Sequence, residues 1–299
     1  MSPSAQNASH FSELPTDRKG ERLWVYRSEW LPGVEFMKVT DSDRNWVVVH
    51  DTYSACLVLS PTSLRADWRY RGREHCVGLG QMQLMEPGEV HQTTKVSHPA
   101  SFFVVRWHAS VLQEAAEHLG STRALHLKEA QIGTPRVTDS FRGLHETLRS
   151  GASYADIECW LAESTYRLIE QCAESAPRGS TACASHAGLR RVRRYLDQCF
   201  DGDIMLDDLA KEAGMAKFHF AHTFANAYGV PPRRYLMLRR VEAARRYIES
   251  GASIAEASAL VGFADQAHLT RKFRTIMGVT PGAWARAMRR RSAFSGPSA

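Results

Sequence analysis

The stretch of sequence that decides the fold of the last third of the chain reads GFADQAHLTRKF at residues 262–273 and GVTP at residues 278–281. A turn glycine, an aspartate able to cap a helix and apolar residues at helical spacing together predict a tight turn followed by a helix. Leu269 and Phe273 share one face of that helix and would close a core. The opposite face holds the small and donor-rich side chains that base edges and phosphates require, namely Gln266, Ala267, His268, Arg271 and Lys272.

The same pattern occurs earlier in the chain. Residues 206–232 align with residues 254–281, and five pairs lie 49 positions apart: His219 and His268, Phe220 and Leu269, Phe224 and Phe273, Gly229 and Gly278, and Pro232 and Pro281. Gly214 and Gly262 lie 48 apart, so one residue is inserted in the second turn. A repeat of helix, glycine turn and helix predicts a duplicated helix-turn-helix. The outward residues of the first copy are Lys217, Phe218, Ala221 and His222.

A helical bundle whose polar face only meets water is the alternative interpretation of this repeat. Two copies that each carry a turn glycine, a polar face and flanking arginines favour the helix-turn-helix interpretation.

A long helix is expected between the two copies, from Pro231-Pro232 to about Ser250. It would hold the two units at a fixed separation, and roughly 34 Å would place both second helices in successive major grooves of B-DNA. One protomer could then read both grooves. Arginines cover much of this helix and are expected to contact phosphates, which makes binding salt-dependent; they stand at positions 233, 234, 239, 240, 245 and 246.

The charge of the chain is divided unequally along its length. Through Ser185 there are 19 lysines and arginines against 22 aspartates and glutamates, a net charge of −3; the remaining residues hold 19 against 10, a net charge of +9. A basic domain beside a mildly acidic one suggests a polyanion as the partner of the basic domain. A solvated basic helix surface is the simpler alternative. The first 185 residues are not expected to touch DNA.

The quoted stretch, its first copy and the layout of the last third resemble the AraC/XylS family of transcription regulators, from about residue 186 to residue 290. The resemblance implies base-reading positions at Phe218, Ala221 and His222 in the first unit and at Gln266, Ala267, His268 and Arg271 in the second. Lys217 and Lys272 are outward neighbours of these positions. The first unit departs from the family pattern, because Ala216 replaces the usual capping serine and His222 the usual arginine. Its contact with DNA is therefore expected to be weaker or more sensitive to pH.

The first half of the chain reads as a β domain. Short β-rich runs between Trp24 and Trp107 are separated by turn residues, which predicts a small barrel or sandwich. The runs are 46–49, 55–59, 76–79, 83–85 and 102–105. Residues 80–91 resemble the second motif of the cupins, whereas the preceding sequence offers only His75 for the first motif. A cupin metal site needs three or four convergent ligands, so no metal, no cofactor and no catalysis are expected.

The interior of this barrel is the expected effector site. Aromatic walls with a few polar groups suit a small molecule, and the candidate lining residues are Trp46, Trp68, His75, His91 and Trp107. Core packing is the alternative role of each of these side chains. The sequence does not identify the effector.

Three helices are expected after Trp107. The third has an apolar face formed by Ile157, Trp160, Leu161, Ser164, Leu168 and Cys172. This face is expected to pack on its own barrel and, alternatively, to supply a dimer interface.

The predicted fold class is α+β multidomain: a cupin-like β-barrel with following helices, then an all-α double helix-turn-helix domain. The predicted boundaries are a flexible arm at 1–22, an effector and dimerisation domain at 23–175, a linker at 176–186, a DNA-binding domain at 187–291 and a flexible tail at 292–299. Six cysteines without a C-x-x-C pair are expected to be free thiols. No apolar run approaches the roughly 18–20 residues of a membrane span, and residues 1–22 lack a secretory apolar region.

These observations predict a cytoplasmic, nucleoid-associated bacterial regulator, not an enzyme, that binds promoter DNA. The resemblance implies a ligand-responsive activator, a homodimer, a small-molecule effector and contact with RNA polymerase. A metal-dependent cupin enzyme fused to a nucleic-acid-binding module is the alternative. A constitutive DNA-binding protein whose barrel has lost its ligand is a third possibility.

Overall fold

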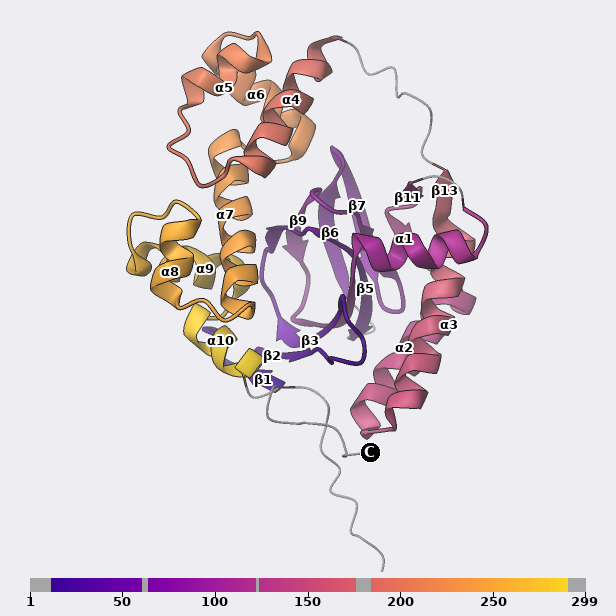
Figure 1. Ribbon diagram of the computed structural model, residues 1–299. Coiled ribbons are helices and arrows are strands. Elements are labelled where there is room, and N and C mark those ends of the chain that lie inside the picture. The colour runs from indigo at the N-terminus through magenta and orange to yellow at the C-terminus, as the bar shows by residue number, and fades with distance from the viewer. Residues whose placement is uncertain (1–11, 61–63, 122–123, 176–183, 290–299) are drawn as a thin grey trace, which may run out of the picture.

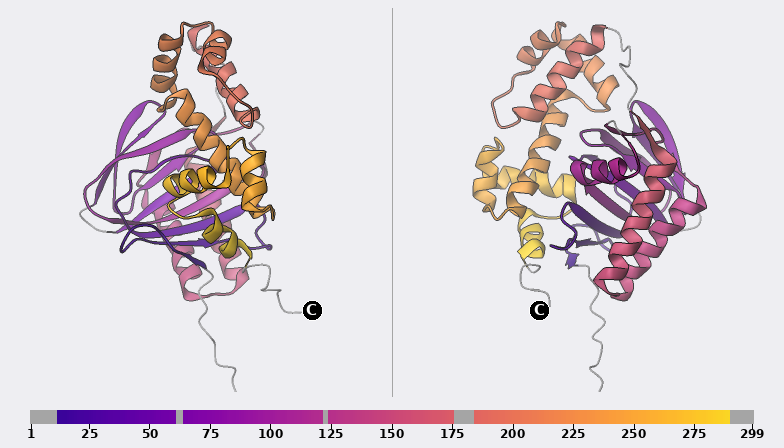
Figure 2. Two further views of the ribbon diagram at one scale, coloured as in Figure 1. Left: turned by 90° about the vertical axis from the view of Figure 1, so that its left-hand side faces the viewer. Right: turned by 45° about the vertical axis from the view of Figure 1, so that its right-hand side comes forward.

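The computed structural model describes residues 12–60, 64–121, 124–175 and 184–289. The chain forms a β-rich domain, here called the β domain, through residue 175, and a helical domain from residue 184. The helical domain lies along one side of the β domain, and the helices that follow the barrel cover the opposite side (Figure 1 and Figure 2). The predicted fold class is confirmed.

The β domain contains two facing antiparallel sheets. The larger sheet has the order β1 (Ser12–Leu14), β2 (Arg22–Tyr26), β3 (Val34–Ser42), β10 (Ala100–His108), β5 (Thr52–Ser60), β8 (Met82–Met85) and β12 (Gln131–Ile132). The smaller sheet has the order β4 (Val47–Val49), β9 (Val90–Val96), β6 (Arg65–Tyr70) and β7 (Arg73–Gly78). A separate pair joins β11 (Leu125–Leu127) to β13 (Ala173–Ser175). Each of the β-rich runs predicted from sequence overlaps one of these strands.

Alternation along β10 separates the two sides of the larger sheet. Phe103, Val105 and Trp107 pack toward the helices, in one apolar core. Phe102 and Val104 alternate with them and face the space between the sheets. Because successive side chains of a strand point to opposite faces, the parity of a residue decides whether it meets the helices or the barrel interior.

Three helices cover the outer face of the larger sheet: α1 (Ala109–His118), α2 (Pro135–Ser150) and α3 (Tyr154–Cys172). The helices α2 and α3 approach closely at Gly143, where a Cβ atom would lie 2.4 Å from the ring of Trp160. The predicted face of α3 is buried within its own domain at Ile157, Leu161 and Leu168. Trp160 on the same face is 40% exposed, so only the buried part of this face is excluded as a free surface for a dimer interface.

The helical domain consists of α4 (Ala184–Gln198), α5 (Leu206–Ala213), α6 (Lys217–Tyr228), α7 (Pro232–Glu249), α8 (Ile254–Leu260), α9 (Gln266–Met277) and α10 (Pro281–Arg289). The pairs α5/α6 and α8/α9 are the two predicted helix-turn-helix units, and α7 is the predicted long helix. Gly262 in the second turn has φ +74°, and a Cβ atom there would lie 2.2 Å from the carbonyl oxygen of Asp201. The second turn therefore requires glycine.

The predicted flexible arm at residues 1–22 needs correction in its second half. Strand β1 pairs with β2, and Leu14 is buried in the core. Asp17 forms ion pairs with Arg44 and Arg274. Residues 12–22 are thus integrated into the β domain because they supply an edge strand and a bridging carboxylate. Residues 1–11, most of the predicted linker and all of the predicted tail lie outside the described residues.

None of the helices in the described ranges combines the length and the apolar composition needed to cross a membrane. Five of the six cysteines lie in described ranges, and all five are free thiols.

Candidate nucleic-acid interface and effector cavity

The second helix-turn-helix unit presents its predicted outward residues on α9. The side chain of Asp265 caps this helix by accepting from the backbone N–H of His268 at 2.6 Å. The outward side chains Gln266, Ala267, Arg271 and Lys272 are exposed. His268 is half-buried, because its ring packs edge-on against Phe263 with centroids 5.1 Å apart. Four of the five predicted side chains are therefore free to meet a groove, and His268 is partly held by packing.

The first unit has a more apolar outward face on α6. Phe218 is 87% exposed and lies in the first turn of the helix, where Ala216 provides no side-chain cap. Asn226 donates from Nδ2 to Nε2 of His222 at 3.0 Å. Lys217 forms an exposed ion pair with Asp207 at 2.9 Å. The two outward faces are thus chemically different: α6 exposes an aromatic ring, whereas α9 exposes amide and guanidinium donors.

The helical domain meets the β domain through paired charges. In four ion pairs, an acidic residue of the β domain binds an arginine of the helical domain. In a fifth pair, the arginine belongs to the β domain and the glutamate to the helical domain. The pairs are Asp17 with Arg274 at 3.3 Å, Glu35 with Arg245 at 3.3 Å, Asp51 with Arg246 at 3.2 Å, Glu89 with Arg193 at 3.0 Å, and Arg27 with Glu249 at 2.8 Å. Part of the charge division seen in the sequence is therefore satisfied inside the molecule.

The arginines of α7 were predicted to contact phosphates, and for several of them this is wrong. Arg239 is buried between Asp51 and Asp197, and Arg245 is buried among carboxylates. Arg240 donates to the carbonyl oxygens of Phe200, Gly202 and Gly262, which ties the segment between α4 and α5 and the turn of the second unit to α7. The exposed arginines on α7 are Arg233, Arg234 and Arg246.

Glu35 is the centre of the buried charge cluster. Its carboxylate accepts from Arg27 at 2.6 Å and from Arg106 at 2.8 Å, and it pairs with Arg245 at 3.3 Å. Burial alone would raise the pKa of this carboxyl, but the guanidiniums of Arg27, Arg245 and Arg106 hold it well below its usual range. Arg245 also pairs with Glu242 and Glu249, both at 2.7 Å. The cluster links strands β3 and β10 to α7.

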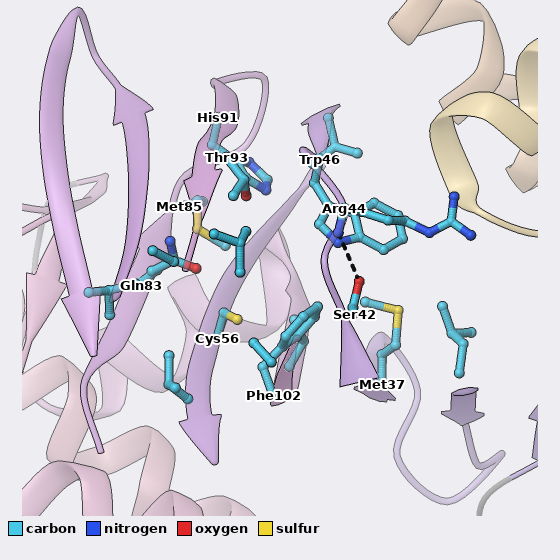
Figure 3. A pocket seen from close by; sticks show the side chains of 18 of the residues that line it. Met37, Ser42, Arg44, Trp46, Cys56, Gln83, Met85, His91, Thr93 and Phe102 are labelled. Atoms are coloured by element: carbon cyan, nitrogen blue, oxygen red, sulfur yellow. Dashed lines mark hydrogen bonds between the residues drawn. The ribbon is translucent and has the colours of Figure 1, made fainter. Parts of the chain in front are cut away.

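A cavity lies between the two sheets and is bounded on one side by the helical domain. It encloses about 970 Å³ not filled by protein atoms, including its open mouth. Figure 3 shows Met37, Cys56, Met85 and Phe102 around this space. The helical domain supplies part of the wall through Ile276, Met277 and Trp284. A molecule in this cavity would therefore touch both domains.

Polar groups are grouped at one part of the cavity wall. The rings of His50 and His91 lie 5.2 Å apart, and Nη2 of Arg106 lies 3.4 Å from Nε2 of His50. Burial, together with the charge of Arg106, lowers the pKa of His91 to about 3 and that of His50 well below its usual value. Both imidazoles are neutral at pH 7, so each can donate one hydrogen bond and accept another.

Two of the five predicted effector residues line this cavity, Trp46 and His91. Trp68 is buried on β6, where it stacks on Tyr70 and packs against His75, and neither Trp68 nor His75 belongs to the cavity wall. Trp107 lies on the opposite face of the larger sheet, edge-on to Phe141. Trp107 lies outside the wall because aromatic character does not tell which face of a strand is occupied. Trp68 has the same parity on β6 as the cavity residue Ala66, but it packs in the apolar core beside the cavity.

Sequence reasoning missed His50 and Arg106 as cavity residues. Arg106 has the same parity on β10 as Phe102 and Val104, which is the signal that could have placed it in the barrel. Within the described ranges, no group of three or more histidine, cysteine, aspartate or glutamate side chains could hold a metal ion.

Sequence models of two protein families match the chain in the order of its domains. An AraC-like ligand binding domain matches residues 65–159, and a helix-turn-helix domain matches residues 209–287. The TetD protein of transposon Tn10 from Escherichia coli is 30% identical over 99 residues, which are 33% of this chain and 72% of that protein. The chain belongs to the AraC family. The matched residues of this AraC-family chain include both helix-turn-helix units and most of the smaller sheet.

Other relatives of this AraC-family chain are matched over shorter parts. The transcriptional activator NphR of a Rhodococcus species is 42% identical over 96 residues, which are 31% of this chain and 28% of NphR. The chain thus spans less than a third of that relative. Among solved structures, ToxT of Vibrio cholerae has a TM-score of 0.49 at 12% identity, with 92% of this chain and 100% of ToxT covered.

Proposed function

We propose that this AraC-family protein is a sequence-specific regulator of transcription that binds promoter DNA with α6 and α9 and responds to a small molecule in the barrel. One observation carries this proposal: each unit buries one face of its second helix and leaves the predicted base-reading face open. Phe220 and Phe224 are buried in α6, and Leu269 and Phe273 in α9. The predicted base-reading residues are Phe218, Ala221, His222, Gln266, Ala267, His268 and Arg271, flanked by Lys217 and Lys272.

The two helices are expected to make different contacts. Arg271 and Gln266 are suited to hydrogen-bond base edges in the major groove, while Phe218 and Ala221 are suited to contact thymine methyl groups. Arg233 and Arg234, which are exposed on α7, are available for phosphates. The specificity of the second unit would then rest on hydrogen bonds and that of the first on apolar contact.

The cavity is the proposed effector site. Its wall combines apolar side chains with neutral imidazoles, which is typical of small-molecule pockets. Because α9 and α10 complete the wall, an effector in the cavity can bind one arrangement of the two domains more tightly than another. Binding then shifts the protein toward that arrangement. This gives the effector a physical route to the DNA-binding surface.

The remaining parts of the proposal follow from family membership. We infer an activator, because relatives such as NphR are named transcriptional activators. Contact with RNA polymerase, a homodimer and a bacterial cytoplasm as the site of action, in association with the nucleoid, belong to the same proposal. Dimerisation would use surfaces other than the buried face of α3.

The test uses the full-length protein and DNA from upstream of the genes near its own. Genomic footprinting identifies the bound sites, and the affinity for one such site is measured between about 50 and 200 mM salt. A protein with several phosphate contacts loses on the order of a thousandfold in affinity over this range. Specific sites are expected to be bound more tightly than shuffled sequences of the same composition. Equal affinity for both would contradict the proposal.

A further inference from the structure

The wall of the barrel cavity contains cations and no acid. Arg44 and Arg106 are its charged members, and the described residues around the cavity include neither aspartate nor glutamate. Arg44 is held by two carboxylates that lie outside the cavity wall: its Nε donates to both oxygens of Glu21, at 2.8 and 2.7 Å, and Nη2 pairs with Asp17. Arg106 is therefore the cation that a ligand could address.

Arg106 has donor capacity that the protein does not use. Its Nη1 donates to Glu35 at 2.8 Å, its Nη2 faces Nε2 of His50 at 3.4 Å, and its buried Nε has no partner among the described residues. Because guanidinium can only donate, Nε2 of His50 is the accepting nitrogen, which assigns the imidazole proton to Nδ1.

Two more donors of the wall lack acceptors. The protonated Nδ1 of His50 and Nε1 of Trp46 are buried and, within the ranges that the structure describes, have no hydrogen-bond partner. Buried donors without acceptors are costly in a folded protein. A ligand that fits this wall supplies acceptors, and a carboxylate is a stronger acceptor for a guanidinium than a neutral group is.

The rest of the cavity is apolar and rich in sulfur. Met37, Met85 and Met277 lie around it together with the rings of Phe102 and Trp284. Methionine side chains adapt their shape to a ligand, and they contact aromatic groups favourably. This part of the wall suits a hydrocarbon or aromatic body.

We propose that the cavity binds a small organic acid whose carboxylate accepts hydrogen bonds from Arg106 and His50 while its apolar body lies among Met37, Met85 and Phe102. This inference rests on the proposed function, since it names the chemical class of the effector at the same site. The carboxylate shares Arg106 with Glu35, so the ligand acts at the charge cluster that holds α7.

The test uses the full-length protein and three carboxylates of increasing apolar size, benzoate, 3-phenylpropanoate and octanoate, each beside its primary amide. Binding is followed by calorimetry and by tryptophan fluorescence, because Trp46 and Trp284 lie in the wall. At least one carboxylate should saturate the protein below about 10 mM, and its amide should bind at least about tenfold more weakly. Equal binding of acid and amide, binding of amides alone, or no saturable binding of any acid would overturn the inference.

Variants assign the contact to Arg106. Arg106→Gln should weaken the best carboxylate by at least about tenfold and leave its amide unchanged, while Arg73→Gln, at an exposed position of β7, should change neither. An unchanged carboxylate affinity in folded Arg106→Gln would overturn the assignment. Should this variant not fold, His50→Phe and Trp46→Phe each remove one donor and should each weaken the carboxylate by about threefold or more; unchanged affinity in both would overturn it.

DNA binding by the same preparations separates the two proposals. Salt-dependent, site-specific DNA binding without any carboxylate binding would overturn the ligand class and leave the regulator proposal standing. Absence of specific DNA binding would contradict the proposed function whatever the cavity binds.

Discussion

Glu35 of strand β3 and Arg245 of helix α7 lie 3.3 Å apart in the interior of the protein, although 210 residues separate them in sequence. Both side chains are almost completely buried, and each has other charged partners. Removing one partner of a buried, hydrogen-bonded ion pair leaves a charge in a medium that solvates it poorly. The packing of α7 against the barrel is therefore sensitive to any change in the charge cluster around Glu35.

Replacing Arg245 with alanine should lower the free energy of unfolding by about 3–5 kcal/mol, because Glu35, Glu242 and Glu249 lose a shared cation. Urea unfolding of the full-length protein measures this change. Arg246→Ala is the matched control: this neighbour is about half exposed, and its pair with Asp51 should contribute about 1 kcal/mol or less. Equal stabilities of the two variants would show that the cluster does not hold the domains together.

Replacing Arg271 with alanine should reduce discrimination between the preferred site and a site altered at one base by about 1–3 kcal/mol. Arg234→Ala should instead weaken binding to all sequences alike. It should also reduce the slope of log affinity against log salt concentration by about one. Competition binding with single-base variants of the footprinted site measures both effects. The assignment of roles would be wrong if both substitutions weakened every sequence by the same factor.

Replacing Phe218 with alanine should cost little stability, because the side chain is 87% exposed, but it should lower affinity for the half-site of the first unit. The expected loss is about 1 kcal/mol per thymine methyl contacted. DNA in which uracil replaces thymine lacks that methyl group, so the wild type should bind it more weakly and Phe218→Ala should not distinguish the two. A variant that still prefers thymine would contradict the proposed contact.

Stability should fall as the pH is lowered from about 6.5 to 5. Burial lowers the pKa of His91 to about 3 and that of His145 to about 4, and it lowers that of His50 as well. In the unfolded chain these imidazoles titrate near their usual value of about 6.5. The unfolded state then binds more protons, so unfolding is favoured by about 1.5 kcal/mol per histidine at pH 5.

Urea unfolding between pH 7 and pH 5 measures this slope, and His91→Gln should remove one histidine's share of it. Glu35 also loses stabilisation on acidification, but because its pKa is lowered from 4.5, that loss falls below this range. A slope that is identical in wild type and His91→Gln would contradict the buried neutral state of His91.

The helical domain could be predicted in detail, whereas the cavity could not. Helical spacing, turn glycines and the 49-residue repeat are local features, and they located α6, α7 and α9 correctly. The contacts of Arg245 and Arg239 were missed because their carboxylate partners on the barrel lie almost 200 or more positions away in sequence. Charge alone does not reveal whether an arginine meets DNA or a carboxylate of the same chain.

The candidate effector residues show the same limit. Trp46 and His91 line the cavity, but Trp107 does not. The face that a side chain occupies follows from alternation along the strand, which can be used only once the ends of the strand are known. Trp284 is a cavity residue that no local pattern could indicate, since it reaches the barrel from the other domain.

The wall of the cavity includes Ile276 and Met277 of α9, the proposed base-reading helix, and Trp284 of α10. The halves of this regulator are therefore not interchangeable parts. A hybrid in which a relative's DNA-binding half replaces residues 184–289 would have a cavity with a partly foreign wall, and under the proposed function an altered choice of effector. Under the same proposal, any change of operator preference in α9 is constrained by the side chains of α9 that line the cavity.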